Sequence, residues 1–249
     1  MTDRHSFPSF DGVDLSWQEV GAGRPVVLLH GLFSTSDTNW TKYGHAKQLA
    51  DAGFRAILPD LRGHGQSAAP HDAAAYPPDV LAQDAAALVA HLGLSDYDLG
   101  GYSLGGRTTM RCLVRGMTPR RAVIAGMGLS GIVEAGTRTE WFLNVIANAD
   151  SFERGSHGWT AAQFMRTNKI DGEAVAHVLR SQIVTTAAEV AAINTSVLVL
   201  CGADDRDNGS APDLAAALPH GTYVEMPGTH MSSVVGPAMG AAIVEYLSA

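Results

Sequence analysis

Gly101-Tyr102-Ser103-Leu104-Gly105 places a serine between two glycines, directly after an apolar run and before a helical pattern. A strand that turns sharply into a helix strains the backbone of its central residue and leaves no room for side chains on either side. The pattern therefore predicts a turn that lifts the Ser103 hydroxyl out of the sheet edge, where it can act as a nucleophile. The same five residues also fit an ordinary glycine-rich loop, so the surrounding elements must decide.

A serine nucleophile needs two partners. Its hydroxyl is too weakly acidic to attack an acyl carbon at neutral pH unless a neutral imidazole takes its proton, and a carboxylate must orient that imidazole. His230 is the candidate base, because Pro227-Gly228-Thr229-His230 follows the last strand pattern and precedes the last helix pattern. This position predicts that His230 lies at the same edge of the sheet as Ser103. The alternative interpretation is that His230 only caps the final helix.

Two further strand patterns precede the serine motif. Residues 25–29 form an apolar run of the kind typical of a strand buried on both faces, and it ends in His30-Gly31-Leu32-Phe33. Residues 54–58 form a second run, which leads into the segment from Pro59 to Ser67.

Strand patterns alternate with helical patterns along most of the chain, which indicates a mostly parallel sheet covered on both faces. Residues 7–10 and 13–20 predict an antiparallel hairpin joined through Asp11-Gly12. Further strands are predicted at residues 97–102, 122–126, 196–200 and 222–226, and helices at 40–52, 78–92, 104–116, 211–218 and 237–247. Residues 136–189 show helical periodicity without a strand pattern.

The motifs resemble those of the α/β-hydrolase superfamily, in the branch with a serine nucleophile, a His-Gly oxyanion loop and an Asp-x-Arg-Gly-His-Gly-x-Ser segment. His30-Gly31, the segment from Asp60 to Ser67 and the serine turn stand in the family's order. The resemblance extends from about Phe10 to Leu247 and is weakest between about Ile132 and Thr195. It implies an α/β fold with a mostly parallel sheet of about eight strands and helices on both faces. It also implies a core at residues 1–130 and 196–249 and a helical cap insertion at residues 131–195.

The resemblance also assigns roles to individual residues. The acid should follow the strand at residues 197–200, where the family pattern Gly-x-x-Asp selects Asp205, while Asp204, Asp207 and Glu134 stay open as alternatives. The order Ser103, Asp205, His230 is the order of this superfamily.

The oxyanion hole is expected to combine the backbone N–H groups of Leu32 and Leu104. His30 is expected to brace the oxyanion loop. His64 is expected to order its own loop, with a catalytic role as the alternative.

Ser103 narrows the chemistry. Haloalkane dehalogenases and epoxide hydrolases of this superfamily carry an aspartate at the nucleophile position, because water must cleave their alkyl-ester intermediate. The sequence also lacks His and Cys at zinc-site spacing and the Lys-Ser/Thr of a phosphate loop, so we expect no metal and no other cofactor. These features predict a serine hydrolase that acts on a carboxylic ester. A lactonase, thioesterase, carbon–carbon hydrolase or perhydrolase would use the same residues, and a protein that only binds a hydrophobic ligand is the alternative of another class.

The predicted cap supplies bulky apolar side chains. We expect Phe33, Trp141 and Trp159 to line an apolar pocket for a small acyl substrate, although each could instead pack the cap against the core. Other members of this apolar set are Phe142, Phe152, Phe164 and Met165.

Length and composition fit one enzyme domain, since 249 residues that are 46% hydrophobic and 17% charged can build a large core. The net charge of −8 argues against a nucleic-acid or anionic-membrane partner. No apolar signal segment or membrane-length run occurs, so a cytoplasmic location is expected. Cys112 and Cys201 are expected to be buried free thiols.

Overall fold

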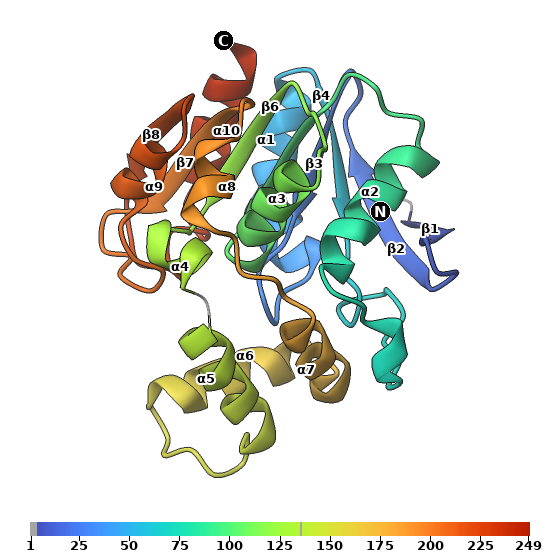
Figure 1. The fold of residues 1–249 in the computed structure, drawn as a ribbon, viewed down its shortest axis with the longest axis vertical. Coiled ribbons are helices and arrows are strands. Elements are labelled where there is room, and N and C mark those ends of the chain that lie inside the picture. Colours follow the sequence, from blue (N-terminus) through green and yellow to red (C-terminus); the bar gives the residue numbers. More distant parts are fainter. Residues whose placement is uncertain (1–3, 135) are drawn as a thin grey trace.

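Eight strands form one sheet in the computed structural model, which describes residues 4–134 and 136–249, and residue 137 by its backbone alone (Figure 1). Their order is β1-β2-β4-β3-β5-β6-β7-β8. The strands are β1 (Arg4–Pro8), β2 (Asp14–Val20), β3 (Arg24–Leu29), β4 (Phe54–Pro59), β5 (Asp98–Tyr102), β6 (Arg121–Ala125), β7 (Ser196–Gly202) and β8 (Gly221–Met226). β1 and β2 pair antiparallel, β2 pairs antiparallel with β4, and all later pairs are parallel. The predicted fold class is confirmed.

Helices cover both faces of this sheet. The helices of the described chain are α1 (His45–Asp51), α2 (Val80–His91), α3 (Leu104–Val114), α4 (Leu129–Val133), α5 (Gly136–Ala147), α6 (His157–Thr167), α7 (Gly172–Arg180), α8 (Ala187–Ala191), α9 (Ala211–Ala217) and α10 (Ala238–Ser248). A π-helical turn, η1 (Asp37–Thr41), precedes α1, and a short 3-10 turn, η2 (Ala73–Ala75), precedes α2.

Successive side chains of a strand point to opposite faces of the sheet, so they pack into two different hydrophobic cores, one on each face. Val27 and Leu29 pack with residues of α2 and α3, whereas Val26 and Leu28 pack with residues of α1 and α10. Burial on both faces explains why these strands appear in the sequence as continuous apolar runs.

Several element boundaries differ from the sequence prediction, and three of them lie at turns. The helix expected at residues 40–52 is divided into η1 and α1, because Gly44 between them has a left-handed backbone with φ 83°. The helix expected from residue 78 begins at Val80, because Asp79 is also left-handed, with φ 59°. Phe10 lies beyond the end of β1, in the turn before β2, and is 46% exposed.

The segment between β6 and β7 is helical in its described part, and its middle helices α5, α6 and α7 lie away from the sheet (Figure 1). We call these three helices the cap layer. By contrast, Ile132 of α4 and Val190 of α8 pack into the core beside β6 and β7. The division into a core and an insertion at residues 131–195 stays a proposal.

Both cysteines, Cys112 and Cys201, are buried free thiols. Within the described residues, no helix combines the length and the apolar character needed to cross a membrane.

Candidate active site

Ser103 lies at a strained turn between β5 and α3. Its backbone has φ 52° and ψ −112°, and its N–H donates to the carbonyl of Ala125 at 2.8 Å. A Cβ on Gly101 would lie 2.2 Å from the carbonyl carbon of Gly105, and one on Gly105 would lie 2.1 Å from the Leu29 oxygen. The two glycines are therefore required because backbone from the facing segments fills the space of a side chain.

Ser103, His230 and Asp205 are joined by two hydrogen bonds. Nε2 of His230 lies 3.0 Å from Oγ of Ser103, and Nδ1 lies 2.8 Å from Oδ2 of Asp205. The three residues follow β5, β8 and β7, which are parallel strands whose carboxyl ends meet at one sheet edge. In this geometry the imidazole can accept the serine proton while the carboxylate fixes its tautomer.

The acid loop holds Asp205 inward. Asp205 is buried, and its Oδ1 accepts the N–H of Asp207 at 3.0 Å. Burial alone would raise the pKa of Asp205, but the hydrogen bond and charge of His230 together with the Asp207 N–H bring it below its usual value. Asp204, Asp207 and Glu134, the alternatives left open by the sequence, are exposed at the rim of the cavity described below.

Tyr102 supports His230 from the preceding residue of the turn. Its hydroxyl donates to the backbone carbonyl of His230 and lies 3.2 Å from Oγ of Ser233, and the two rings lie 5.3 Å apart. This contact was not predicted from the sequence. The only signal was a polar aromatic residue at the variable position of the serine motif, and nothing in it points to a partner far along the chain.

The loop after β3 forms a turn that contains Leu32. The Ser34 N–H donates to the Gly31 carbonyl at 3.2 Å, and Phe33 within this turn has φ 57°. Oδ1 of Asn39 accepts the N–H of Gly31 at 3.0 Å, a support that the sequence did not reveal. Leu104 opens α3, so its N–H has no acceptor within its own helix.

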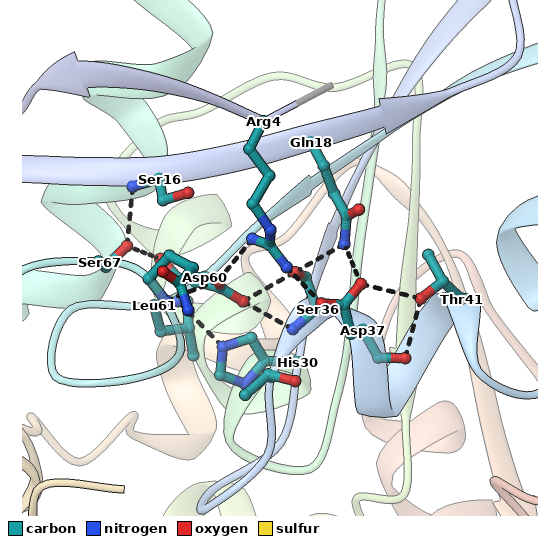
Figure 2. A network of polar contacts seen from close by, with 12 residues as sticks. Arg4, Ser16, Gln18, His30, Ser36, Asp37, Thr41, Asp60, Leu61 and Ser67 are labelled. Atoms are coloured by element: carbon teal, nitrogen blue, oxygen red, sulfur yellow. Dashed lines mark hydrogen bonds and ion pairs between the residues drawn. The ribbon is translucent and has the colours of Figure 1, made fainter. Parts of the chain in front are cut away.

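His30 braces this loop from below (Figure 2). Its Nε2 accepts the Leu61 N–H at 3.0 Å, so the ring proton lies on Nδ1 and is donated to the Gly31 carbonyl at 2.8 Å. Burial lowers the pKa of His30 and outweighs the opposing effect of Asp60, which favours the neutral ring that this geometry requires.

Figure 2 also shows how Asp60 joins neighbouring segments. Its carboxylate accepts the N–H and the hydroxyl of Ser36 at 2.8 and 2.7 Å and pairs with Arg4 at 2.9 Å. Nδ1 of His64 donates to the Arg62 carbonyl at 3.1 Å, and burial lowers the pKa of His64 to about 3. His64 thus contacts its own loop, with its ring edge-on to His30 at 5.1 Å.

A cavity of about 880 Å³ lies between the sheet edge and the cap layer, and both Ser103 and His230 line it. Its size falls within the usual range for small-molecule sites, on the order of 300–1,000 Å³. The apolar part of its wall is formed by Leu32, Phe33, Leu104, Met127, Trp141, Phe142, Ala161, Phe164, Leu179 and Met231. An aromatic and aliphatic wall of this kind fits an apolar substrate.

The structure separates the expected pocket residues. Phe33 and Trp141 line the cavity, and Phe33 also packs edge-on against Phe142 at 5.6 Å. Trp159 does not, so this expectation was wrong. His157, Ala161 and Phe164 mark the face of α6 that lines the cavity, and the helical period of about 100° per residue places Trp159 on the opposite face.

Asp205, Asp207 and His230 bring potential metal ligands within 4.8 Å of one another. The sequence did not reveal this group, because its members come from loops after different strands. A metal there would compete with the hydrogen bond between Asp205 and His230, since both already use ligand atoms in it.

Comparison with a family model places a similarity in the first half of the chain. A family described by the alpha/beta hydrolase fold matches residues 24–125. Over 121 residues the chain is 39% identical to a non-heme haloperoxidase from Rhodococcus erythropolis. The aligned region covers 47% of this chain and 41% of that protein. Over 95 residues it is 41% identical to an epoxide hydrolase from Caballeronia sordidicola, covering 38% and 28% of the two chains. The chain thus spans less than half the length of these curated relatives.

The fold extends over the whole chain. A solved structure of a thermophilic esterase from Thermogutta terrifontis has a TM-score of 0.80 and 23% identity, and covers 99% of this chain and 98% of its own.

Proposed function

Because this chain belongs to the α/β-hydrolase superfamily, we propose that it is a cofactor-free serine hydrolase that cleaves a carboxylic ester of a small, largely apolar substrate. The observation that carries this proposal is the pair of hydrogen bonds, at 3.0 and 2.8 Å, that connects Ser103 through His230 to Asp205. A serine, an imidazole and a buried carboxylate in this order form the arrangement used for acyl transfer on unrelated folds.

The reaction proceeds in two acyl transfers. Ser103 Oγ attacks the ester carbonyl carbon while His230 Nε2 takes its proton, and the N–H groups of Leu32 and Leu104 stabilise the oxyanion. His230 then gives the proton to the departing alcohol oxygen as the ester bond breaks. Water attacks the acyl-enzyme with His230 as base again, which releases the carboxylic acid and restores Ser103.

The serine at position 103 argues against epoxide hydrolysis, despite the similarity to an epoxide hydrolase. Attack of Ser103 on an epoxide would leave an ether, which water does not cleave at neutral pH. Attack of an aspartate would leave an ester, which water can hydrolyse. We therefore assign this chain to acyl chemistry.

Perhydrolysis is a second candidate, favoured by the similarity to a non-heme haloperoxidase. Hydrogen peroxide would replace water in attacking the acyl-enzyme, and the products would be a peracid and the free serine. A lactone, a thioester or an activated carbon–carbon bond could use the same residues. Formation of peracetic acid from hydrogen peroxide and an acetate ester distinguishes perhydrolysis from simple hydrolysis.

A panel of p-nitrophenyl esters tests the proposal on the purified protein. We expect turnover of short-chain esters, labelling of Ser103 by a small fluorophosphonate, and a loss on the order of 10⁴-fold or more in Ser103→Ala with the fold intact by circular dichroism. Ser95→Ala is the matched control, because Ser95 is exposed and precedes the opposite end of β5. Near wild-type turnover in Ser103→Ala would contradict the assignment of the nucleophile. A wild-type protein that binds esters without turnover would support the ligand-binding alternative.

A further inference from the structure

Arg107 and Arg111 lie on one face of helix α3, since they are four residues apart, and Arg115 follows at the helix C-cap. Arg111 donates to both carboxylate oxygens of Asp79, at 3.0 and 2.7 Å, and also lies 3.6 Å from Glu189. Arg115 approaches the same Asp79 at 3.7 Å. The carboxylates near this face are therefore already engaged with Arg111 and Arg115.

Arg107 has no such partner. Its side chain makes no hydrogen bond or ion pair with any residue that the structure describes. Burial and the nearby charge of Arg111 lower the pKa of Arg107 to about 10, although the charge of Asp79 opposes the shift, so the guanidinium stays charged at neutral pH. A largely buried charge without a hydrogen-bonded counter-charge is costly, which makes an anion at this position favourable.

The position of Arg107 connects it with the catalytic serine. Arg107 lies one helical turn beyond Ser103, and its backbone N–H donates to the Ser103 backbone carbonyl at 2.9 Å. Both residues line the same cavity. The other arginines of that cavity have acceptors: Arg138 pairs with Asp207 at 3.1 Å, and Arg206 donates to the Ala203 carbonyl at 2.7 Å.

Gln182 lines the cavity beside Arg107. It follows α7, where the chain returns from the cap layer to the core, and its side-chain amide has no hydrogen-bond partner within the described residues. A guanidinium and an amide together offer several N–H donors to one carboxylate.

We propose that Arg107, assisted by Gln182, binds a carboxylate of the substrate, so that the preferred substrates are esters carrying a free acid group a few bonds from the scissile carbonyl. This inference rests on the proposed serine-hydrolase function. Because Ser103 and Arg107 line the same cavity, one small substrate can reach both residues. The rest of the substrate would contact the apolar wall formed by Phe33, Leu104 and Leu179.

The acid group can belong to either half of the ester, and two matched substrate pairs distinguish these cases. Monoethyl glutarate against diethyl glutarate tests an acid on the acyl half. Acetoxyacetate against its methyl ester, followed by acetate release, tests an acid on the alcohol half. The readout is the ratio of kcat/KM for the acid to kcat/KM for its neutral partner.

We expect the wild type to prefer the acid in one of the two pairs, and Arg107→Gln to lower that ratio by about 10- to 100-fold, the range of one charge-assisted hydrogen-bond pair. Arg107→Lys should retain part of the preference, since it keeps the charge but loses the forked geometry. Arg180→Gln is the matched control, because Arg180 is exposed at the end of α7 and does not line the cavity.

Ratios that are equal in the wild type and in Arg107→Gln for both pairs would overturn the inference while leaving the serine hydrolase intact. If instead the wild type neither reacts with a fluorophosphonate nor cleaves any ester, the proposed function fails. Binding of glutarate measured by calorimetry still decides the role of Arg107 in that case, with weaker binding by Arg107→Gln expected and equal binding contradicting it. Should Arg107→Gln fail to fold, the same measurements on Arg107→Lys and Gln182→Leu apply.

Discussion

Sγ of Cys201 lies 3.6 Å from Oδ2 of Asp205, the same oxygen that accepts the hydrogen bond from Nδ1 of His230. Burial and the charge of Asp205 raise the pKa of the Cys201 thiol to about 12, so it stays a neutral donor. With the N–H of Asp207 on the other oxygen, the Asp205 carboxylate is fixed in both position and ionisation.

This arrangement predicts which carboxylate in the loop is essential. Asp205→Asn should lower kcat on the order of 10⁴-fold, because an amide can hold the imidazole in the wrong tautomer. Asp204→Asn and Asp207→Asn should cause losses of less than about tenfold, since neither contacts His230 in the observed geometry. Steady-state kinetics of the three variants decides the matter, and a more severe defect in Asp204→Asn or Asp207→Asn would mean that another carboxylate orients the base.

The close backbone approach at the serine turn predicts a stability effect. Gly105→Ala should lower the free energy of unfolding by about 1–3 kcal/mol or more, because the added Cβ would lie 2.1 Å from the Leu29 oxygen. Gly236→Ala is the control, since a Cβ there meets no atom within 4 Å. Chemical denaturation of both variants measures the difference, and equal stabilities would show that the turn can open to accept a side chain.

The two tryptophans of the cap layer should behave differently. Trp141 lines the cavity and is 37% exposed, whereas Trp159 does not line it. We therefore expect Trp141→Ala to change the preference among esters of different acyl length, with Trp159→Ala as the matched control that keeps the wild-type profile. Fluorophosphonate labelling of Ser103 should stay nearly unchanged in both. A shifted profile in Trp159→Ala alone would contradict the assignment of the cavity-lining face of α6.

His71 and Asp171 predict a pH-dependent attachment of α7 to the core. His71 Nε2 lies 2.9 Å from Oδ2 of Asp171, and Nδ1 lies 3.3 Å from Glu173. The hydrogen bond and charge of Asp171 raise the pKa of His71. Burial opposes the change at Asp171, but the hydrogen bonds from His71 and the Ala174 N–H lower its pKa.

The sign follows from linkage. A raised folded pKa means that the stabilisation by His71 is fully present below about pH 6.5 and is lost as the pH rises through the folded value. The lowered pKa of Asp171 removes its contribution only below about pH 4. The difference in Tm between the wild type and His71→Gln should therefore be larger at pH 5.5 than at pH 9. His220→Gln, at an exposed histidine without an ion pair in the described part of the chain, is the control. A difference that does not change with pH would exclude this ion pair as a contributor.

The sequence by itself determined the elements that follow from local rules. Apolar runs bounded by glycine and proline predicted the strands. The serine turn could be recognised in the sequence because only glycine fits the backbone at positions 101 and 105. Ser103 and His230 could be predicted as partners because each comes after a predicted strand, and the carboxyl ends of parallel strands lie at one edge of the sheet. The helix boundaries at Gly44 and Asp79 were not predicted, because the sequence pattern around both residues is helical and does not show that their backbones are left-handed.

Only the tertiary structure decided which side chains meet across long sequence separations. The pairing of Asp205 rather than its neighbours with His230, and the support from Tyr102 and Asn39, depend on loop conformations after different strands. The same holds for the faces of the cap helices: periodicity shows that α6 is amphipathic, but its packing against the core decides that Phe164 and not Trp159 lines the cavity. Arg107 stands out for the same reason, because the absence of a hydrogen bond or ion pair to its side chain among the described residues is a property of the folded neighbourhood and leaves no mark in the sequence.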